Sequence, residues 1–499
     1  MPTSCASAEF SMIAPPVLVR VSGRVMAAAG RGRPARSLLA ILALASMRLL
    51  GADAPAEGWA ARDAVLARIV APTFPARDFD VKTFGASPLG RFDAREAFAK
   101  AIAACTAAGG GRVVVPAPGV YYVEGPIHLA SNVNLHIECG ATIVFGVLPQ
   151  SYLPVVLTRF EGTMLMGHSP RIYARGARNV AITGGGTIDG NGRDSLVVMR
   201  DAPGRAGSGT LRQMGSEGVP VAGRVFGEGR WLRSSMIQFL ECEQVLIEGV
   251  KVVDSPFWVI HPVLCRNVTV RGVTVESWNG NNDGCDPDSS SDVLIEDCIF
   301  RTGDDSIAIK SGRDQDGWAV GRPSENIVIR NVVMGSRHAG VCIGSEMSGD
   351  VRNVWVENCT VESASSAFYF KANLDRGGVV ENFHARGITV QKVREAVIRF
   401  GTTYHGYRGG NFPPVFRRFE ITDLLCRESE KLGVSLDGQP AAPIEDVRLR
   451  RVKIERAGEP LWLRHTRGVR FDDVEINGQR LPAEPVDTPA VQARPEISA

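Results

Sequence analysis

The chain has 499 residues, with 56 Lys and Arg against 54 Asp and Glu, so its net charge is close to neutral at +2. Apolar residues make up 44% of it, which is typical of a globular protein with a large core. No run of Lys or Arg stands out, and this argues against nucleic acid as a partner. A polyanionic substrate would need a few well-placed cations.

Residues 1–54 have the pattern of a secretory leader. A basic region (31–36) precedes the apolar segment 37–54, "SLLAILALASMRLLGADA", which ends in Ala-x-Ala. This order is typical of a cleavable signal peptide, and Met26 offers a start that gives a leader of ordinary length. The apolar stretch is too short to span a bilayer. We therefore expect export to the periplasm or the exterior, with no membrane partner after the signal is removed.

The rest of the chain divides into three parts. We interpret 55–78 as a linker, 79–480 as one repeating domain and the Pro-rich 481–499 as a disordered tail. Within the domain, residues 193–229 form a Gly-rich segment that is too long for a simple connection. This segment is either a wall of a binding site or plain disorder.

One phrase recurs through the domain. An Asn or Asp opens a segment of alternating apolar and polar residues that ends at Gly, Asn or Ser. The phrase opens at Asn132, Asn179, Asn267, Asp292, Asn326, Asn353 and Asn382. Alternation predicts strands, and recurrence at about two to three dozen residues predicts a solenoid. We therefore expect an all-β fold, a single-stranded right-handed parallel β-helix, because a sandwich would not repeat the phrase so often.

The segment 92–111, "FDAREAFAKAIAACTAAGGG", predicts a helix that covers the open N-terminal end of the solenoid. Asp93 and Glu96 have the spacing of a capping box. An apolar stripe follows at helical spacing, formed by Phe98, Ile102 and Cys105.

The chain has ten cysteines, and none belongs to a C-x-x-C pair. Four of them lie in strand-like segments, namely Cys285, Cys298, Cys342 and Cys359. We expect these to be free thiols packed in the core, with no zinc site.

Carboxylates gather in "NNDGCDPDSS" (281–290) and "TGDDSIAIKSG" (302–312). Uncompensated carboxylates repel one another and resist burial, so such a cluster indicates metal binding, acid/base catalysis or a solvated turn. Equivalent positions of a β-helix stack about 4.8 Å apart, which allows the coils to be aligned.

Placing Cys285, Ile307, Val341 and Phe368 in one inward column also aligns the polar residues. The resulting columns are Asn282, Asp304 and His338; Asp283 and Asp305; Asp286 and Tyr369; and Asp288, Lys310 and Lys371. Three close carboxylates cannot all ionise freely, so at least one pKa should rise. A protonated acid beside ionised partners suits glycosidic hydrolysis. Calcium is the alternative, but the EF-hand pattern is absent and Lys371 would oppose it.

At these residues the sequence resembles glycoside hydrolase family 28, the polygalacturonases, from about Phe79 to Arg399. The family motifs N-T-D, G-D-D, G-H-G and R-I-K read here as Asn281-Asn282-Asp283, Gly303-Asp304-Asp305, Arg337-His338-Ala339 and Tyr369-Phe370-Lys371. The resemblance implies that Asp304 is the general acid and that Asp283 and Asp305 hold the attacking water, which gives inversion. It also implies that His338 tunes Asp304, that Lys371 binds the sugar carboxylate, and that no metal or other cofactor takes part.

Two motif positions depart from the family. Tyr369 stands where the family has Arg, which removes a bidentate carboxylate clamp, and Arg337 replaces a Gly. Arg376 is our hypothetical substitute for the clamp; its alternative is an exposed turn arginine. The remaining substrate-contact predictions are Asp286, Lys310 and Asn282, together with Tyr369 and Arg337. For His261 and Trp258, buried packing is favoured over a place on the cleft floor.

The sequence thus predicts an exported, inverting, exo-acting hydrolase of α-1,4-linked galacturonosyl bonds in pectin or its oligosaccharides. We expect a monomer whose partner is this polysaccharide. Three alternatives stay open. One is a rhamnogalacturonan or xylogalacturonan hydrolase of the same family, another is a calcium-dependent β-eliminase, and the last is a non-catalytic carbohydrate-binding β-helix.

Overall fold

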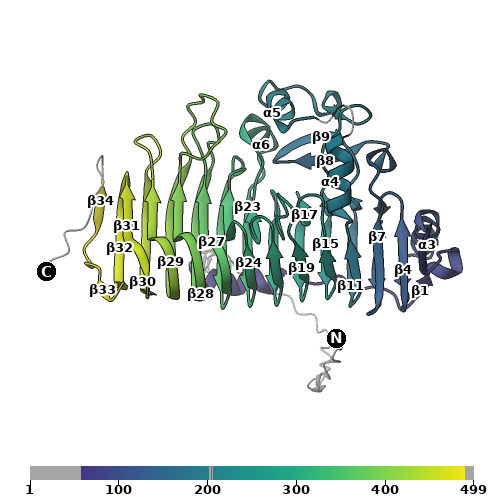
Figure 1. Ribbon diagram of the computed structural model, residues 1–499, viewed down its shortest axis with the longest axis horizontal. Helices are drawn as coiled ribbons and strands as arrows, with labels where there is room; N and C mark the ends of the chain where they lie inside the picture. Colours follow the sequence, from purple (N-terminus) through teal and green to yellow (C-terminus); the bar gives the residue numbers. More distant parts are fainter. Residues whose placement is uncertain (1–57, 202–203, 205, 489–499) are drawn as a thin grey trace, which may run out of the picture. The chain divides into compact units, whose positions relative to one another are not determined.

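The computed structural model describes residues 58–201, 204 and 206–488 (Figure 1). The predicted leader, 1–54, lies outside this range. Nearly all of the described chain belongs to one unit that begins at Arg62. Among these residues, no helix combines the length and the apolar character that crossing a membrane requires.

The strands stack side by side in three parallel ladders, and each coil contributes one strand to each ladder (Figure 1). The first ladder contains β1 (Asp78–Asp80), β3 (Gly111–Val115), β6 (Val133–Ile137), β11 (Arg178–Gly184), β15 (Glu243–Glu248), β18 (Arg266–Arg271), β20 (Ser291–Glu296), β23 (Ser324–Arg330), β26 (Val351–Glu357), β30 (Ile444–Ile454) and β32 (Thr466–Ile476). The second contains β2 (Leu89–Asp93), β4 (Gly119–Val123), β7 (Ala141–Phe145), β12 (Thr187–Asp189), β16 (Lys251–Val253), β19 (Thr274–Ser277), β21 (Ile299–Thr302) and β24 (Val333–Ser336).

The third ladder forms the floor of the site described below. It contains β5 (Ile127–His128), β10 (Ile172–Arg175), β14 (Ile237–Leu240), β17 (Ile260–Val263), a bridge at Cys285, β22 (Ile307–Ile309), β25 (Ala339–Gly344) and β31 (Ala457–Arg464). The long strands β27 (Thr360–Lys371), β28 (Val379–Gly401) and β29 (Val415–Asp437) each continue through more than one ladder. The predicted right-handed parallel β-helix is confirmed.

The recurring Asn or Asp forms a corner of each coil. All seven of these residues adopt left-handed backbone angles, with φ between 51° and 62°, a region that Asn and Asp tolerate better than other side chains. Their amides also stack: Asn382 donates to Asn353, and Asn353 donates to Asn326, each over 3.1 Å. The opening residue of the repeated phrase therefore forms a corner, and hydrogen bonds between such corners link neighbouring coils.

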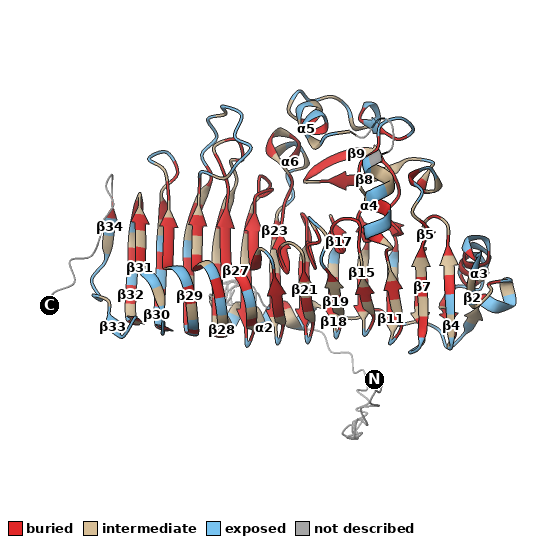
Figure 2. Cartoon of the chain, in the orientation of Figure 1, coloured by how far each residue is buried: buried red, intermediate tan, exposed pale blue. Residues whose placement is uncertain are grey.

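The core fills the inside of the coils with apolar side chains (Figure 2). The predicted inward column is confirmed by the pairing of Cys285 with Ile307, of Ile307 with Val341, and of Val341 with Phe368. The four cysteines expected in the core are free and buried.

Helix α3 (Arg95–Ala107) lies at the N-terminal end of the stack (Figure 1). Its predicted apolar stripe is buried, at Phe98, Ile102 and Cys105. The predicted capping box is wrong. Asp93 belongs to β2, and its carboxylate accepts from the backbone N–H groups of Arg95 and Glu124, each over 2.9 Å. Glu96 pairs with Lys100 instead, at 2.8 Å.

The predicted linker and tail both contain ordered structure. The linker includes α2 (Trp59–Arg68), and Arg68 donates to Asp292 over 2.8 Å. Just before the tail, β33 (Gln479–Arg480) pairs antiparallel with β32, and within the tail β34 (Val486–Thr488) does the same. The hydroxyls of Thr466 and Thr488 are 2.8 Å apart. The tail therefore protects the exposed edge of the last coil, and residues 489–499 lie outside the described range.

The described residues of segment 193–229 form helices and a strand, which excludes the alternative of plain disorder for them. The elements of this segment are α4 (Gly192–Asp201), α5 (Ser208–Ser216), η3 (Val221–Gly223) and β13 (Val225–Phe226). Leu211 and Phe226 anchor it by packing with Phe160, Leu165 and Phe257. β13 joins β8 (Val156–Phe160) and β9 (Thr163–Gly167) in a small sheet beside α6 (Asp314–Val320), above the coils (Figure 1). Two further short helices are η1 (Val81–Phe84) and η2 (Pro149–Tyr152).

Replacement of a corner Asn should separate its two contributions to stability. Asn353→Gly keeps the left-handed conformation and removes two side-chain hydrogen bonds, so we expect a loss of about 1–3 kcal/mol. Asn353→Ala adds backbone strain of about 1–2 kcal/mol. Urea unfolding midpoints measure both, and equal losses in the two variants would contradict the role of the backbone angle.

Candidate active site

The acidic side chains meet at the amino ends of three successive third-ladder segments. Asp283 precedes Cys285, Asp304 and Asp305 precede β22, and His338 precedes β25. Gly303 permits this arrangement, because a Cβ there would lie 2.1 Å from the carbonyl oxygen of Asn279 in the preceding coil. The turn that presents the two adjacent carboxylates therefore lies directly against its neighbour.

Asp305 is the centre of the hydrogen-bond network. Its Oδ1 accepts from Nδ1 of His338 (2.6 Å) and from the backbone N–H of Ala339 (3.0 Å), while its Oδ2 accepts from Nζ of Lys371 (2.9 Å). Burial by itself would raise the pKa of Asp305. The charges of Lys371 and then His338 outweigh burial and hold the pKa well below its usual range. Asp305 is therefore the ionised member of the cluster.

Asp304 is the more open carboxyl, with 27% of its side chain exposed. Its Oδ1 accepts from the backbone N–H of Asp305 (3.0 Å) and lies 3.7 Å from Nδ1 of His338. Burial, followed by the charge of Asp305, raises its pKa. The pKa values of the two adjacent carboxyls therefore shift in opposite directions, and of the two it is Asp304 that retains a proton to higher pH.

Asp283 and Asp286 lie beside this pair and share one cation. Nζ of Lys310 is 3.5 Å from Asp283 and 3.6 Å from Asp286. Burial raises the pKa of both carboxyls well above the usual range; Asp304 adds to the effect on Asp283, and Asp283 adds to that on Asp286. Asp283 Oδ1 has no hydrogen-bond partner within the described chain.

Lys310 and Asp286, which were predicted to contact substrate, are both buried. Lys310 is 3% exposed and Asp286 is fully buried. Nζ of Lys310 is also 3.4 Å from Glu346 and 4.4 Å from the ring centroid of Trp258. Lys310 is therefore an internal counter-ion that compensates buried carboxylates.

Asn282 also supports the site from within. It is fully buried, its Oδ1 accepts from the hydroxyl of Ser277 and the backbone N–H of Asn279 (3.1 Å), and its Nδ2 donates to the carbonyl of Phe257 (3.0 Å). These bonds hold the turn that carries Asp283. The substrate contact of Asn282 stays a prediction.

Asp288 belongs to a separate buried ion pair. Its Oδ1 accepts from Nη1 of Arg159 over 2.8 Å, and its Oδ2 lies 3.5 Å from Nε2 of His261. His261 and Trp258 are both buried, which confirms the packing interpretation.

Lys371 is 4% exposed and lies 5.3 Å from the ring centroids of both Tyr369 and Tyr404. Arg337, in contrast, is exposed, and its guanidinium lies 5.6 Å from the ring centroid of Trp278. Of these predicted substrate contacts, Lys371 and Tyr369 adjoin the carboxylates, whereas Arg337 lies on the surface.

The geometry does not favour Arg376 as a carboxylate clamp. Arg376 is 1% exposed; its Nη1 donates to Asp314 (2.6 Å) and its Nε donates to the carbonyl of Ser345 (2.7 Å). Nor is it an exposed turn arginine. The turn after β27 folds toward the start of α6, and the guanidinium neutralises the buried carboxylate found there.

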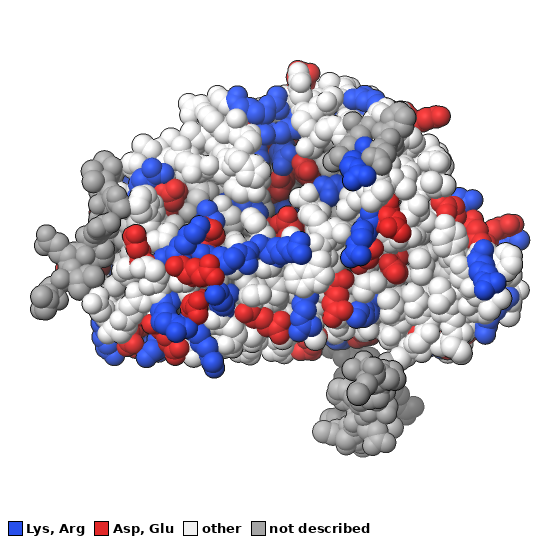
Figure 3. Space-filling model, viewed as in Figure 1, with Lys and Arg blue, Asp and Glu red and all other residues white. Residues whose placement is uncertain are grey.

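Arg212 of α5 links three of the connections between coils. Its guanidinium donates to Asp314 (2.7 Å), to Asp375 (2.8 Å) and to the carbonyl of Gly406. These three acceptors follow the carboxyl ends of third-ladder strands in three different coils. Figure 3 shows basic side chains gathered over this region, beside α5 and α6. A single arginine thus joins three connections into one wall.

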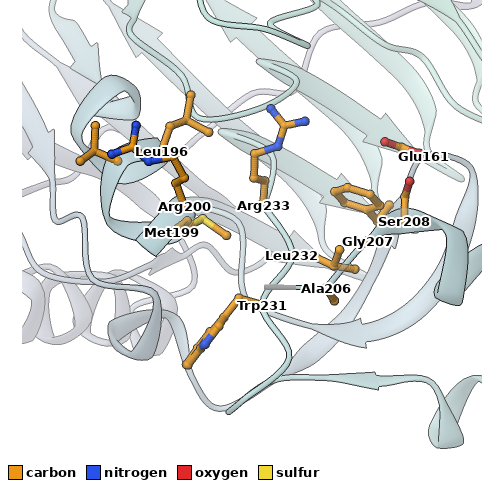
Figure 4. A pocket seen from close by; sticks show the side chains of 12 residues that line it. Glu161, Leu196, Met199, Arg200, Ala206, Gly207, Ser208, Trp231, Leu232 and Arg233 are labelled. Atoms are coloured by element: carbon orange, nitrogen blue, oxygen red, sulfur yellow. The ribbon is translucent and has the colours of Figure 1, made fainter. Parts of the chain in front are cut away.

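Two cavities flank the cluster. One, of about 380 Å³, is lined by residues that include His338, Tyr369, Arg399 and Asp437. The other, of about 650 Å³, lies in the inserted segment (Figure 4), where Glu161 and Ser208 face one side and Leu196 and Arg200 the other. Arg233 connects the second cavity to the site through a 2.6 Å hydrogen bond to Asn281.

A metal ion would find one group of ligands here. Oxygen or nitrogen atoms of Asp304, Asp305 and His338 lie within 4.8 Å of one another. The ammonium of Lys371 already occupies the positive position beside Asp305, so its charge opposes a second cation.

Three comparisons place the chain among known proteins. A family model described as "Glycosyl hydrolases family 28" matches residues 155–466. A "Probable polygalacturonase" of Vitis vinifera is 30% identical over 240 residues, which are 47% of this chain and 48% of that protein, so the match spans about half of that relative's length.

Among solved structures, a hyperthermoactive exopolygalacturonase from Thermotoga maritima is similar, with 37% identity and a TM-score of 0.80 over 87% of this chain and 99% of that one. A family 28 exopolygalacturonase of Yersinia enterocolitica, at 22% identity and a TM-score of 0.68 over 84% of this chain and 80% of that one, shares the fold.

Three residues of the site were missed by the sequence reasoning, namely Glu346, Arg212 and Arg399. Glu346 and Arg212 form ion pairs with residues that are distant in sequence, and no local sequence pattern predicts such pairs. Arg399 had a signal, because the phrase that opens at Asn382 continues the aligned columns and places Arg399 beside Tyr369, as the register now shows.

Removal of the central carboxylate should destabilise the fold in a pH-dependent way. Because the folded-state pKa of Asp305 is lowered, its contribution is present above the unfolded value of about 3.9 and is lost as pH falls through the folded value. Asp305→Asn should therefore cost about 3–5 kcal/mol at pH 7 by leaving Lys371 buried without its partner. The difference from wild type should shrink below about pH 4. Chemical unfolding at several pH values measures this.

Asp304→Asn is the matched control, since that carboxyl is more open and its pKa is raised. It should change stability at pH 7 far less than Asp305→Asn. Equal losses for the two variants would contradict the central role of Asp305.

Proposed function

We propose that this chain, which belongs to glycosyl hydrolases family 28, cleaves α-1,4-linked galacturonosyl bonds in pectin or its oligosaccharides with inversion, from a chain end. Membership of the family makes it a glycoside hydrolase. The observation that carries the proposal is the opposite shift of two adjacent carboxyls, Asp304 with a raised pKa and Asp305 with a lowered one. Glycosidic hydrolysis by inversion requires one acid and one base.

In this mechanism Asp304 donates its proton to the glycosidic oxygen as the bond to the anomeric carbon breaks. A water molecule attacks the opposite face of that carbon and transfers a proton to Asp305, the ionised carboxylate. Asp283, whose Oδ1 has no hydrogen-bond partner in the described chain, is the proposed second acceptor for this water. His338 positions Asp305 through the 2.6 Å hydrogen bond and does not itself need to exchange a proton.

Lys371 is the proposed contact to the sugar carboxylate. Burial would lower its pKa, but the charge of Asp305 outweighs burial and raises the pKa well above the usual range. Lys371 therefore stays charged. The same shift argues against β-elimination, which requires a Lys or Arg that can accept a proton.

We also propose that the Arg212 bridge blocks one end of the groove. A polymer that cannot pass beyond the bridge must enter with one end, whereas a groove open at both ends would favour internal cuts. The similar Thermotoga maritima protein is described as an exopolygalacturonase. Tyr369, where the family carries Arg, keeps a rhamnogalacturonan or xylogalacturonan hydrolase as the second candidate.

Export is part of the proposal. It is supported by the basic and apolar segments of residues 31–54, which lie outside the described range. We also propose that the enzyme works as a monomer on its polysaccharide substrate.

A product profile on a panel of pectic oligosaccharides tests the proposal. Homogalacturonan, rhamnogalacturonan and xylogalacturonan fragments are incubated with and without a chelator, and reducing ends and ultraviolet absorbance are followed. We expect chelator-resistant release of saturated galacturonic acid from one end of homogalacturonan. Rising absorbance would instead indicate β-elimination, and binding without cleavage across the panel would indicate a carbohydrate-binding β-helix.

Removal of the proposed general acid, Asp304, should lower turnover sharply. General acid catalysis contributes about 10²- to 10⁴-fold, so Asp304→Asn should lower kcat by this factor while circular dichroism stays unchanged. The wild-type rate should fall as pH rises through the raised pKa of Asp304, because the proton to be donated is then lost. Asp423→Asn, at an exposed carboxylate paired with Arg451, is the control and should leave kcat unchanged. Retained turnover in Asp304→Asn would remove it from the role of acid.

Opening the wall should change the mode of cleavage. Arg212→Ala removes bonds to three connections, so we expect more internal cuts, measured as a larger drop in pectate viscosity per reducing end formed. Arg212→Lys retains a charge without the forked guanidinium and should give an intermediate ratio. An unchanged ratio, despite a lower unfolding midpoint, would show that the bridge is purely structural.

A further inference from the structure

We infer that the cavity beside His338 binds the uronate next to the cleaved bond and that Arg399 recognises its carboxylate. The inference rests on the proposed function and adds a specificity-determining residue to it. It concerns a position one coil beyond the motif residues, in a cavity whose lining includes neither the acid pair nor Lys371.

The register brings Arg399 to the position where a cation is missing. Arg399 of β28 pairs with Tyr369 of β27, and its guanidinium carbon lies 4.6 Å from the Tyr369 ring centroid. Successive coils are about 4.8 Å apart. The motif position that carries Arg in the family carries Tyr369 here, and Arg399 supplies a guanidinium one coil further along, over the ring of Tyr369.

The guanidinium of Arg399 is more available than others around the site. Arg376 and Arg212 donate to carboxylates at hydrogen-bond distance, and their side chains are 2% and 10% exposed. Arg399 is 34% exposed and has one ion pair, to Glu395 at 4.0 Å. Stacking on Tyr369 fixes the plane of the guanidinium while leaving its N–H edge open to a ligand.

The rest of the cavity has the chemistry of a sugar site. Its volume is about 380 Å³, and its lining includes the polar residues Thr403, His405 and Ser435 as well as Asp437. The charge of Asp437 is neutralised by Nε of Arg464 at 2.5 Å, so it can accept a sugar hydroxyl without repelling a carboxylate.

His338 lines the cavity and also binds Asp305. A sugar in the cavity therefore adjoins the cleaved bond. With one available cation and several hydroxyl partners, the cavity fits a hexuronate better than a neutral sugar, which would leave the guanidinium without a partner.

Steady-state kinetics on two substrates tests the inference. Trigalacturonate is compared with the same trisaccharide after reduction of its carboxyl groups to hydroxymethyl groups. Arg399→Gln should lower kcat/KM for trigalacturonate about 10- to 100-fold, the range for loss of a hydrogen bond between charged groups. It should change kcat/KM for the reduced trisaccharide less than about 3-fold by the same reasoning. Arg399→Lys should recover part of the loss, because it restores the charge without the fork.

Arg427→Gln, at an exposed arginine of β29 outside the cavity, is the control and should leave both rates unchanged. Equal losses on both substrates, or no loss with trigalacturonate, would overturn the inference. Calorimetric binding of trigalacturonate to wild type and Arg399→Gln is measured in parallel. If wild type hydrolyses neither substrate, the proposed function fails, and the binding difference alone then decides the role of Arg399: weaker binding to the variant supports it, and equal binding overturns it.

Discussion

Three hydrogen-bond donors from two neighbouring coils converge on the carboxylate of Asp305, and the properties of the site follow from that convergence. The ammonium of Lys371 can be buried only because Asp305 is charged, and Asp305 can be charged in a buried place only because Lys371 and His338 meet it. The fixed negative charge then raises the pKa of Asp304. A single ion thus sets the protonation of its neighbour and the orientation of the imidazole.

The solenoid makes this convergence possible, because the register of its paired strands fixes which residues of successive coils lie side by side. Residues that are 22 to 34 positions apart in sequence meet at one strand spacing in the coils of the site once the corners are fixed. The corner asparagines hold that register through their backbone angles and their stacked amides. Polar residues at the same offset from each corner therefore form columns, and a column of acids becomes a reactive cluster.

Much of this could be predicted from sequence, since column alignment needs only alternation and repeated corners. The pairing of Cys285, Ile307, Val341 and Phe368 followed from that pattern alone. The burial of side chains that point outward from the third ladder could not be predicted in this way. Such a residue reaches solvent only if no other segment covers it. The helices of segment 193–229 and the turns after β22 and β27 supply that cover. This is why Lys310, Asp286 and Arg376 were expected at the surface and lie inside.

The corners and the connections also differ in what they can tolerate. The corners are held by left-handed residues, and several are also joined by side-chain hydrogen bonds between successive coils, so we expect an insertion there to disturb the stacking. The connections that follow third-ladder strands vary from short turns to the segment containing α6, and side chains such as Arg212 join several of them. The molecule therefore separates the part that keeps coils in line from the part that shapes the groove. Connections can be exchanged between related solenoids to alter what is bound, while the underlying coils continue to stack.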